Sequence, residues 1–178
     1  LLAQIHSGEA VLPDFQRGRE GARHLIALDA VEELLGIRKA GGELHIGALA
    51  TIAHIARSPV VRAWMEALAE AAAAIGSPPI RSRATIGGNF CRAVPCADTP
   101  APCIAAGARV RLVGPAGERE LPAELFIIGS RRTALRPGEL FVEVILPAQP
   151  VGAASSYQRF TRRRGSALAV ASVAARVS

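Results

Sequence analysis

The sequence contains no long run of uncharged apolar residues. Its longest apolar stretch, at 71–75, lies close to Glu66 and Glu70, so no segment reaches the about eighteen residues that a membrane-spanning helix requires. The opening residues, LLAQIHSGEAVLP, lack a Met, a basic region and a small-residue cleavage site, so they are not a secretory signal and are typical of the interior of a longer chain. We therefore expect a cytoplasmic protein without a membrane span.

Cysteine is scarce as well. Cys91, Cys96 and Cys103 are spaced irregularly and are odd in number, which fits neither a set of paired disulfides nor a CxxC metal-binding pair. We interpret them as reduced thiols in a loop and in the core. Ligation of an iron–sulfur cluster by the three thiols is the less favoured alternative.

Lysine and aromatic residues are few. Lys39 is the single lysine among 21 basic residues, and the rings come from five Phe, one Trp and one Tyr. The net charge of +6 and the pI near 10.5 permit nucleic-acid binding, but few rings can stack on bases and the arginines form no compact run. Nucleic acid is therefore not the favoured partner, because phosphate-bearing small molecules and acidic proteins suit arginine equally well.

The motifs of several common enzyme classes are also missing. The sequence has no GxGxxG at the start of a helix, no GxxxxGK loop, no HExxH and no GxSxG. Its histidines lie on separate predicted elements without metal-ligand spacing, at positions 6, 24, 45 and 54. We therefore predict no catalytic residue and no metal site of this chain's own.

Apolar periodicity and turn signals predict an α+β fold, with a small βαβ part and a larger part built on an antiparallel sheet. A Pro/Gly/Ala linker after Pro147 then leads into the start of a further α+β domain. In order, the expected elements are a strand at 25–28, a helix at 29–35, a hairpin turning at 40–42 with a strand at 44–46, helices at 51–57, 59–75 and 100–106, a hairpin turning at 114–117, a short helix or loop at 124–126 and a strand at 140–146.

The stretch RSRATIGGNFCRAVPCADTP concentrates the residues best suited to hold a ligand. Residues 84–86 predict the end of a strand. Gly87 and Gly88 then permit positive φ, which would let successive backbone N–H groups converge on an anion such as a pyrophosphate. The Thr85 hydroxyl and the Asn89 amide add donors, and the two arginines before them raise the local potential. On these residues alone, an ordinary Gly-Gly turn is the alternative.

Asp98 stands out in the same stretch. Thr99 and Pro100 already supply the N-cap and the first residue of the next helix, so Asp98 is not needed as a cap. A carboxylate beside a glycine-rich phosphate loop is the usual partner of ribose or polyol hydroxyls. A solvated loop aspartate is the alternative, since Asp is common in turns.

In their order, these segments resemble the FAD-binding subunit of the molybdenum hydroxylases, the family of xanthine dehydrogenase and of the medium subunit of aerobic carbon monoxide dehydrogenase. IRSRATIGGNFCRAVPCADTPA is similar to the family's second flavin motif, GERELPAELFIIGSRRTALRPGELFVEVILP to the end of its flavin domain, and YQRFTRRRGSALAVASVAA to the start of its C-terminal domain. The resemblance covers nearly the whole chain, and the ordered set of TIGGN, a downstream Asp and LRPGEL makes it specific.

The resemblance implies a set of FAD-binding residues. In the family the TIGGN loop wraps the pyrophosphate, the Asp contacts a flavin-side hydroxyl or the ribose, and the Leu of PGEL lies at the isoalloxazine. Ile75 falls where relatives place an apolar residue beside the cofactor, with a plain core position as the alternative. The implied cofactor-binding residues are Thr85, Ile86, Gly87, Gly88, Asn89, Asp98 and Leu140.

The chain also departs from the family pattern. The family's earlier glycine-rich AGG motif, which forms the other half of the pyrophosphate site, would end where Leu1 and Leu2 stand. Gln158 occupies a place where many relatives have a Lys near the flavin ring, and Ser166 a place where an Asp is common. The C-terminal domain stops after its first strands.

The resemblance therefore implies a two-subdomain FAD-binding domain at 1–147 without its first glycine motif, followed by a linker and an incomplete C-terminal domain at 148–178. It implies electron transfer from iron–sulfur clusters through FAD to NAD, a quinone or oxygen. The implied partners are a large subunit that holds a molybdenum-pterin cofactor and a small iron–sulfur subunit. The alternative is a non-enzymatic Arg-rich interaction or nucleic-acid-binding module, or a fragment that cannot hold FAD by itself.

Overall fold

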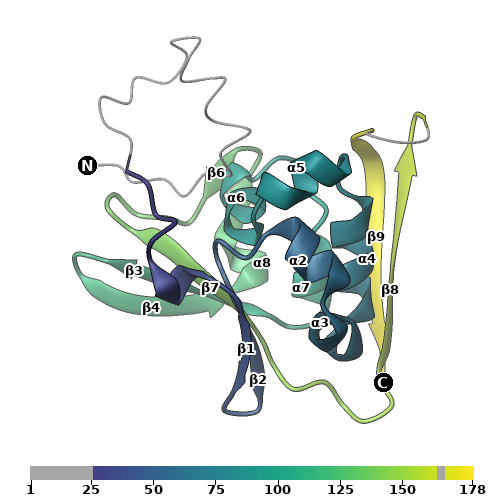
Figure 1. The fold of residues 1–178 in the computed structure, drawn as a ribbon, viewed down its shortest axis with the longest axis horizontal. Helices are drawn as coiled ribbons and strands as arrows, with labels where there is room; N and C mark the ends of the chain where they lie inside the picture. The colour runs from purple at the N-terminus through teal and green to yellow at the C-terminus, as the bar shows by residue number, and fades with distance from the viewer. Residues whose placement is uncertain (1–25, 164–166) are drawn as a thin grey trace.

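The computed structural model describes residues 26–163 and 167–178, and a five-stranded antiparallel sheet is its largest element (Figure 1). Each strand runs antiparallel to its neighbours, and the predicted α+β class with a large antiparallel sheet is confirmed. In spatial order the strands are β1 (Ile37–Ala40), β2 (Glu43–Gly47), β7 (Leu140–Leu146), β3 (Arg109–Gly114) and β4 (Gly117–Pro122).

Helices cover one face of this sheet. The register aligns Ile46, Val144 and Val110 across the three central strands, and all three side chains are fully buried. Burial of such a row of branched side chains between sheet and helices is the main source of stability. The helical elements are the 3-10 helix η1 (Glu32–Leu34), α2 (Ile52–Arg57), α3 (Pro59–Trp64), α4 (Glu66–Ala74), α5 (Pro78–Arg83), α6 (Ile86–Arg92), α7 (Pro100–Ala105) and α8 (Ala123–Phe126).

Local signals in the sequence start two of these helices as predicted. The hydroxyls of Thr51 and Ser58 accept hydrogen bonds from the backbone N–H groups of His54 and Val61, each at 3.2 Å, and so cap α2 and α3. Helix α5 was not predicted, although it begins with two prolines, a residue type favoured in the first turn of a helix.

The predicted single helix over 59–75 is wrong, because Met65 interrupts it with φ −155° and ψ 90°. The interruption leaves the Met65 side chain 2 % exposed. The backbone N–H of Ala67, in the first turn of the new helix, donates to Oγ of Ser155 at 3.1 Å. A contact with a strand far along the chain therefore accompanies the break, and no local signal predicts it.

The first two predicted elements also differ from the structure. Residues 26–28 form no strand, and Leu25 lies outside the described residues. The predicted helix at 29–35 is reduced to η1, since the N–H groups of Val31 and Leu34 donate to the carbonyls three residues earlier, each at 3.0 Å. This short turn leads directly into the β1–β2 hairpin.

A separate two-stranded hairpin lies on the far side of the helices, formed by β8 (Ala154–Thr161) and β9 (Ala169–Val177) (Figure 1). Residues 147–153, which precede it, form neither helix nor strand. The backbone N–H of Tyr157 donates to Glu70 of α4 at 2.7 Å, and the Tyr157 side chain is 5 % exposed. Strand β8 is therefore packed firmly against the helical layer.

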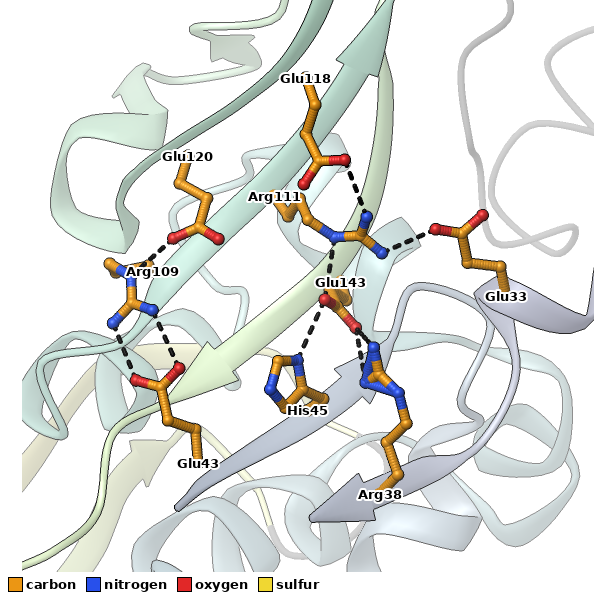
Figure 2. Close-up of polar contacts among 9 residues, drawn as sticks. All are labelled: Glu33, Arg38, Glu43, His45, Arg109, Arg111, Glu118, Glu120 and Glu143. Carbon is orange, nitrogen blue, oxygen red and sulfur yellow. Dashed lines mark hydrogen bonds and ion pairs between the residues drawn. The ribbon is translucent and has the colours of Figure 1, made fainter. Parts of the chain in front are cut away.

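The opposite face of the five-stranded sheet carries an ionic network (Figure 2). At its centre, Glu143 of β7 is 2 % exposed and accepts hydrogen bonds from Arg38 at 3.0 Å and Arg111 at 2.9 Å, with His45 Nδ1 at 3.1 Å. Arg111 also pairs with Glu33 of η1 at 2.9 Å. The network therefore compensates a buried charge and fastens η1 to the sheet. Glu118 is its remaining member, and Arg109 forms a second ionic cluster with Glu43 and Glu120.

Within the described residues, no helix is both long and apolar enough to cross a lipid bilayer.

Candidate functional site

The TIGGN segment forms the first turn of α6, so the predicted strand end followed by a turn is wrong. Thr85 is the N-cap residue, and its hydroxyl accepts a hydrogen bond from the N–H of Gly88 at 3.1 Å. The strand character of the segment is limited to one isolated bridge between Thr85 and Thr51. Thr is a preferred N-cap residue, so the sequence did contain a signal for a helix that starts here.

The predicted cluster of free backbone amides is absent from this segment. The N–H of Ile86 donates to the Ala50 carbonyl at 3.1 Å, and the N–H of Asn89 to the Thr85 carbonyl at 3.0 Å, while that of Gly88 is used by the cap. These residues are helical, and neither Gly87 nor Gly88 has the positive φ that the prediction required.

Close packing explains Gly87. Its N–H donates to the Ala48 carbonyl at 2.9 Å, and an added Cβ would lie 2.8 Å from both the Cβ and the carbonyl oxygen of Ala48. Real Cβ atoms do not approach so closely. Gly87 therefore allows the start of α6 to rest directly on the connection that follows β2.

This connection, residues 48–51, joins the segment to the sheet. The N–H of Ala48 donates to the Val142 carbonyl of β7 at 2.8 Å, while the Ala48 carbonyl accepts from Gly87. Leu140 begins β7 two residues before Val142 and is half-buried. The structure therefore places Leu140 and the start of α6 at the same end of the sheet, as two parts of one candidate site require.

Glu139, the Glu of the LRPGEL motif, has a structural role. Glu139 accepts two hydrogen bonds from the Arg119 guanidinium, both at 2.8 Å, and one from the backbone N–H of Arg136 at 2.7 Å. These bonds, with those from Arg119 the largest cause, lower the pKa of Glu139 to about 2. Glu139 therefore fastens the turn that delivers Leu140 to the sheet.

Asn89 and Asp98, predicted as parts of one site, are brought together through Thr99. Asn89 Oδ1 accepts hydrogen bonds from the backbone N–H of Thr99 at 3.2 Å and from its hydroxyl at 2.7 Å. The Thr99 hydroxyl therefore does not cap α7, which has no side-chain cap, although Pro100 does stand in its first turn as predicted. The bonds fix the segment that carries Asp98 against the end of the TIGGN turn.

Asp98 itself is buried, with 5 % exposure. Its Oδ1 accepts a hydrogen bond from the Tyr157 hydroxyl at 2.5 Å, and Arg159 Nη1 lies 3.3 Å from both carboxylate oxygens. The alternative of a solvated loop aspartate is therefore wrong. Burial, and next the hydrogen bond to Asp98, raise the pKa of Tyr157 above its usual value.

Tyr157 and Arg159 contact Asp98, and the sequence did not single them out as candidates. They stand two apart on β8, so the alternation of a strand turns both towards Asp98, while Gln158 between them is exposed. The positive charge beside Asp98 therefore comes from Arg159, whereas Gln158 stands at the place where many relatives have a Lys. Ser166, the other departure from that pattern, lies outside the described residues.

Two further predicted residues have structural roles. Ile75 is half-buried at the end of α4. Arg81, one of the arginines expected to raise the potential at the loop, donates from Nη1 to the carbonyls of Ile75 at 2.8 Å and Gly76 at 3.3 Å. Arg81 therefore closes the turn between α4 and α5.

The cysteines form no disulfide, and all three thiols are free. Cys103 is fully buried, and burial raises the pKa of the Cys91 thiol to about 12. Thiols with raised pKa values are poor nucleophiles and poor metal ligands. Over residues 26–163 and 167–178, no three His, Cys, Asp or Glu side chains form a group that could hold a metal ion.

Comparison with known proteins adds a family to this geometry. A family model described as the FAD binding domain in molybdopterin dehydrogenase matches residues 3–149. The medium chain of carbon monoxide dehydrogenase from Hydrogenophaga pseudoflava is 37 % identical over 161 residues, which cover 90 % of this chain and 56 % of that protein. The xanthine dehydrogenase FAD-binding subunit of Escherichia coli is 32 % identical over 147 residues, which cover 82 % of this chain and 50 % of that subunit.

A solved structure extends the match to three dimensions. The crystal structure of a copper- and molybdenum-containing carbon monoxide dehydrogenase in a cyanide-inactivated form superposes with a TM-score of 0.92 at 30 % identity, over 98 % of this chain and 60 % of that chain. The chain spans about half the length of the curated relatives it matches.

Proposed function

The chain belongs to the family of FAD-binding domains in molybdopterin dehydrogenases, and from that premise we propose that it binds FAD and carries electrons through it. The observation that supports this most directly is the meeting of Asn89 and Asp98 through Thr99. Both residues occupy positions that bind flavin in the family, and they stand on different elements. The proposed FAD-binding residues are Thr85, Ile86, Gly87, Gly88, Asn89, Asp98 and Leu140, to which Arg159 is added.

The side chains in the site suit the chemical groups of FAD. The Asp98 carboxylate is the kind of acceptor that ribityl or ribose hydroxyls need, and Arg159 beside it supplies a positive charge of the kind that phosphates pair with. Leu140 offers an apolar surface at the same end of the sheet. Because the amides at 86–89 bond within the protein, we assign the TIGGN turn a role in shaping the site rather than in donating backbone hydrogen bonds.

FAD, when bound, supplies the acceptance and release of electrons. The chain's own residues bind and orient it. Asp98 accepts a hydroxyl hydrogen bond, Arg159 balances the Asp98 charge, and the buried environment of Tyr157 keeps water from the carboxylate. No acid or base of this chain takes part in a bond-breaking step in this proposal.

The wider assembly is also a proposal. We assign residues 1–147 to the flavin domain and 148–178 to the linker and start of the next domain. The partners would be a large subunit with a molybdenum-pterin cofactor and a small subunit with iron–sulfur clusters, and NAD, a quinone or oxygen would take the electrons. The free cysteines support a cytoplasmic location.

Flavin retention tests the proposal. The purified full-length protein should be yellow, and its flavin absorbance should survive dialysis. Asp98→Asn should weaken FAD binding about ten- to a hundredfold, as expected for losing a hydrogen bond to a charged group. The matched control is Glu66→Gln, which alters an exposed carboxylate paired with Arg62 and should leave FAD binding unchanged.

A colourless full-length protein that takes up no added FAD would refute the proposal. If that protein instead bound nucleic acid tightly, with an affinity that falls steeply with salt, the Arg-rich binding module would be the correct alternative.

A further inference from the structure

We propose that Tyr157 is a positioning residue for the flavin site, and that through it the docking of the β8–β9 hairpin is coupled to cofactor binding. The inference rests on the proposed function. It assigns Tyr157 no contact with FAD; the hydroxyl acts through Asp98, which it orients.

The hydrogen bond from Tyr157 makes the two carboxylate oxygens of Asp98 unequal, because it reaches only Oδ1. The 2.5 Å distance from the Tyr157 hydroxyl to Oδ1 is typical of a charge-assisted O–H to carboxylate bond. Arg159 Nη1 lies 3.3 Å from both oxygens, so Oδ1 has two partners and Oδ2 has one. Since each carboxylate oxygen can accept two hydrogen bonds, Oδ2 retains capacity for a ligand hydroxyl while Oδ1 is held.

The same tyrosine belongs to the docked hairpin. Its backbone N–H donates to Glu70 of α4 at 2.7 Å, and one turn earlier in that helix the N–H of Ala67 donates to Ser155 of β8 at 3.1 Å. Strand β8 is thus held to α4 by the Tyr157 backbone and the Ser155 side chain, and to Asp98 by the Tyr157 hydroxyl. Residues 147–153, which precede β8, form no helix or strand, so these contacts fix the position of β8.

Coupling follows from this arrangement. If the docked hairpin orients Asp98 for the ligand, then a ligand on Asp98 must favour the docked hairpin by the same factor, because linkage between two binding equilibria is reciprocal. FAD should therefore slow amide hydrogen exchange in β8, although β8 lies beyond the segment 147–153 and on the far side of the helices from the sheet.

A double-mutant cycle on FAD affinity tests the positioning role in the full-length protein. Tyr157→Phe, which keeps the ring in the core, should raise the FAD dissociation constant about tenfold, as expected for a hydrogen bond to a charged group. In the Asp98→Asn background the same change should alter the dissociation constant by less than about twofold, because the two side chains act as one unit. The control Thr161→Val removes the hydrogen bond from the Thr161 hydroxyl of β8 to the Arg163 carbonyl, a bond that joins β8 to neither Asp98 nor α4, and it should leave FAD affinity within about twofold.

Each outcome decides the matter. Equal effects of Tyr157→Phe in both backgrounds, or an equal loss from Thr161→Val, would show that the loss does not come from the hydrogen bond between Tyr157 and Asp98 and would overturn the inference. Hydrogen exchange in the unmutated protein provides a second measurement, and an unchanged exchange rate in β8 on adding FAD would overturn the coupling. A protein that binds FAD while failing these tests leaves the proposed function standing; one that binds no FAD refutes both.

Discussion

Replacing Gly87 by Ala should destabilise the protein even when no FAD is present. The new Cβ would lie 2.8 Å from the Cβ and carbonyl oxygen of Ala48 and 3.1 Å from its Cα, against the about 3.5–4.0 Å at which carbon atoms attract. Ala48 cannot retreat easily, because its N–H is bonded to Val142 and its carbonyl to Gly87 itself.

The magnitude follows from three terms. Overpacking of a rigid contact costs about 1–3 kcal/mol, and weakening of the hydrogen bond between Gly87 and Ala48 about 1 kcal/mol. Alanine is a better helix former than glycine and returns about 1 kcal/mol. We therefore expect the free energy of unfolding to fall by about 1–3 kcal/mol.

Urea denaturation of the flavin-free protein, followed by circular dichroism, measures this change. The midpoint should fall without a change in slope. The control is Gly129→Ala, since a Cβ at Gly129 would meet nothing closer than 3.9 Å. A Gly87→Ala protein as stable as the parent that nevertheless fails to bind FAD would show that the glycine serves the approach of the cofactor, and would refute the packing argument.

Three further changes test other parts of the structure. Glu143→Ala should lower the free energy of unfolding by about 2 kcal/mol, measured in urea, because it removes the buried anion that the half-buried Arg111 and the exposed Arg38 share. The folded-state pKa of Glu139 is about 2 against the usual 4.5, so the stability that its ionised form contributes is present above pH 4.5 and is lost as the pH falls towards 2. In an acid denaturation experiment, Glu139→Gln should lack that loss. An acid transition that is the same in the variant and the parent would contradict the role of Arg119. Gly47→Ala places a Cβ 2.4 Å from the Leu34 carbonyl oxygen and should lower the melting temperature more than Gly87→Ala does, as scanning calorimetry would show.

Local chemistry explains the parts of the fold that were predicted correctly. The hydroxyls of Thr51 and Ser58 cap two helices by accepting a hydrogen bond from the backbone N–H three residues later. The hairpins at Gly41-Gly42 and at 114–117 arise from turn residues between alternating strands. Such signals lie within a few residues of one another, so they act before any tertiary contact forms.

The break at Met65 has a different origin. An unbroken helix over 59–75 is locally favourable, yet the structure interrupts it where Ala67 meets Ser155. The partner stands 88 residues away in the sequence. A pattern within one segment carries no information about a contact of that range.

The candidate site shows the same division. The motif order of TIGGN, Asp98 and LRPGEL identified the family, and that prediction is confirmed by the match over residues 3–149. The sequence alone thus determined the fold class and the family, and it singled out the two segments that we propose to bind flavin, because these depend on local order and composition.

Tertiary structure decided what those residues do. It turned Gly87 from a presumed ligand cradle into a packing contact with Ala48, and it joined Asp98 to Tyr157 and Arg159, 59 and 61 residues further along the chain. A hydrogen bond depends on distances of a few tenths of an ångström. Only the packing of sheet, helices and hairpin against one another sets distances to that precision.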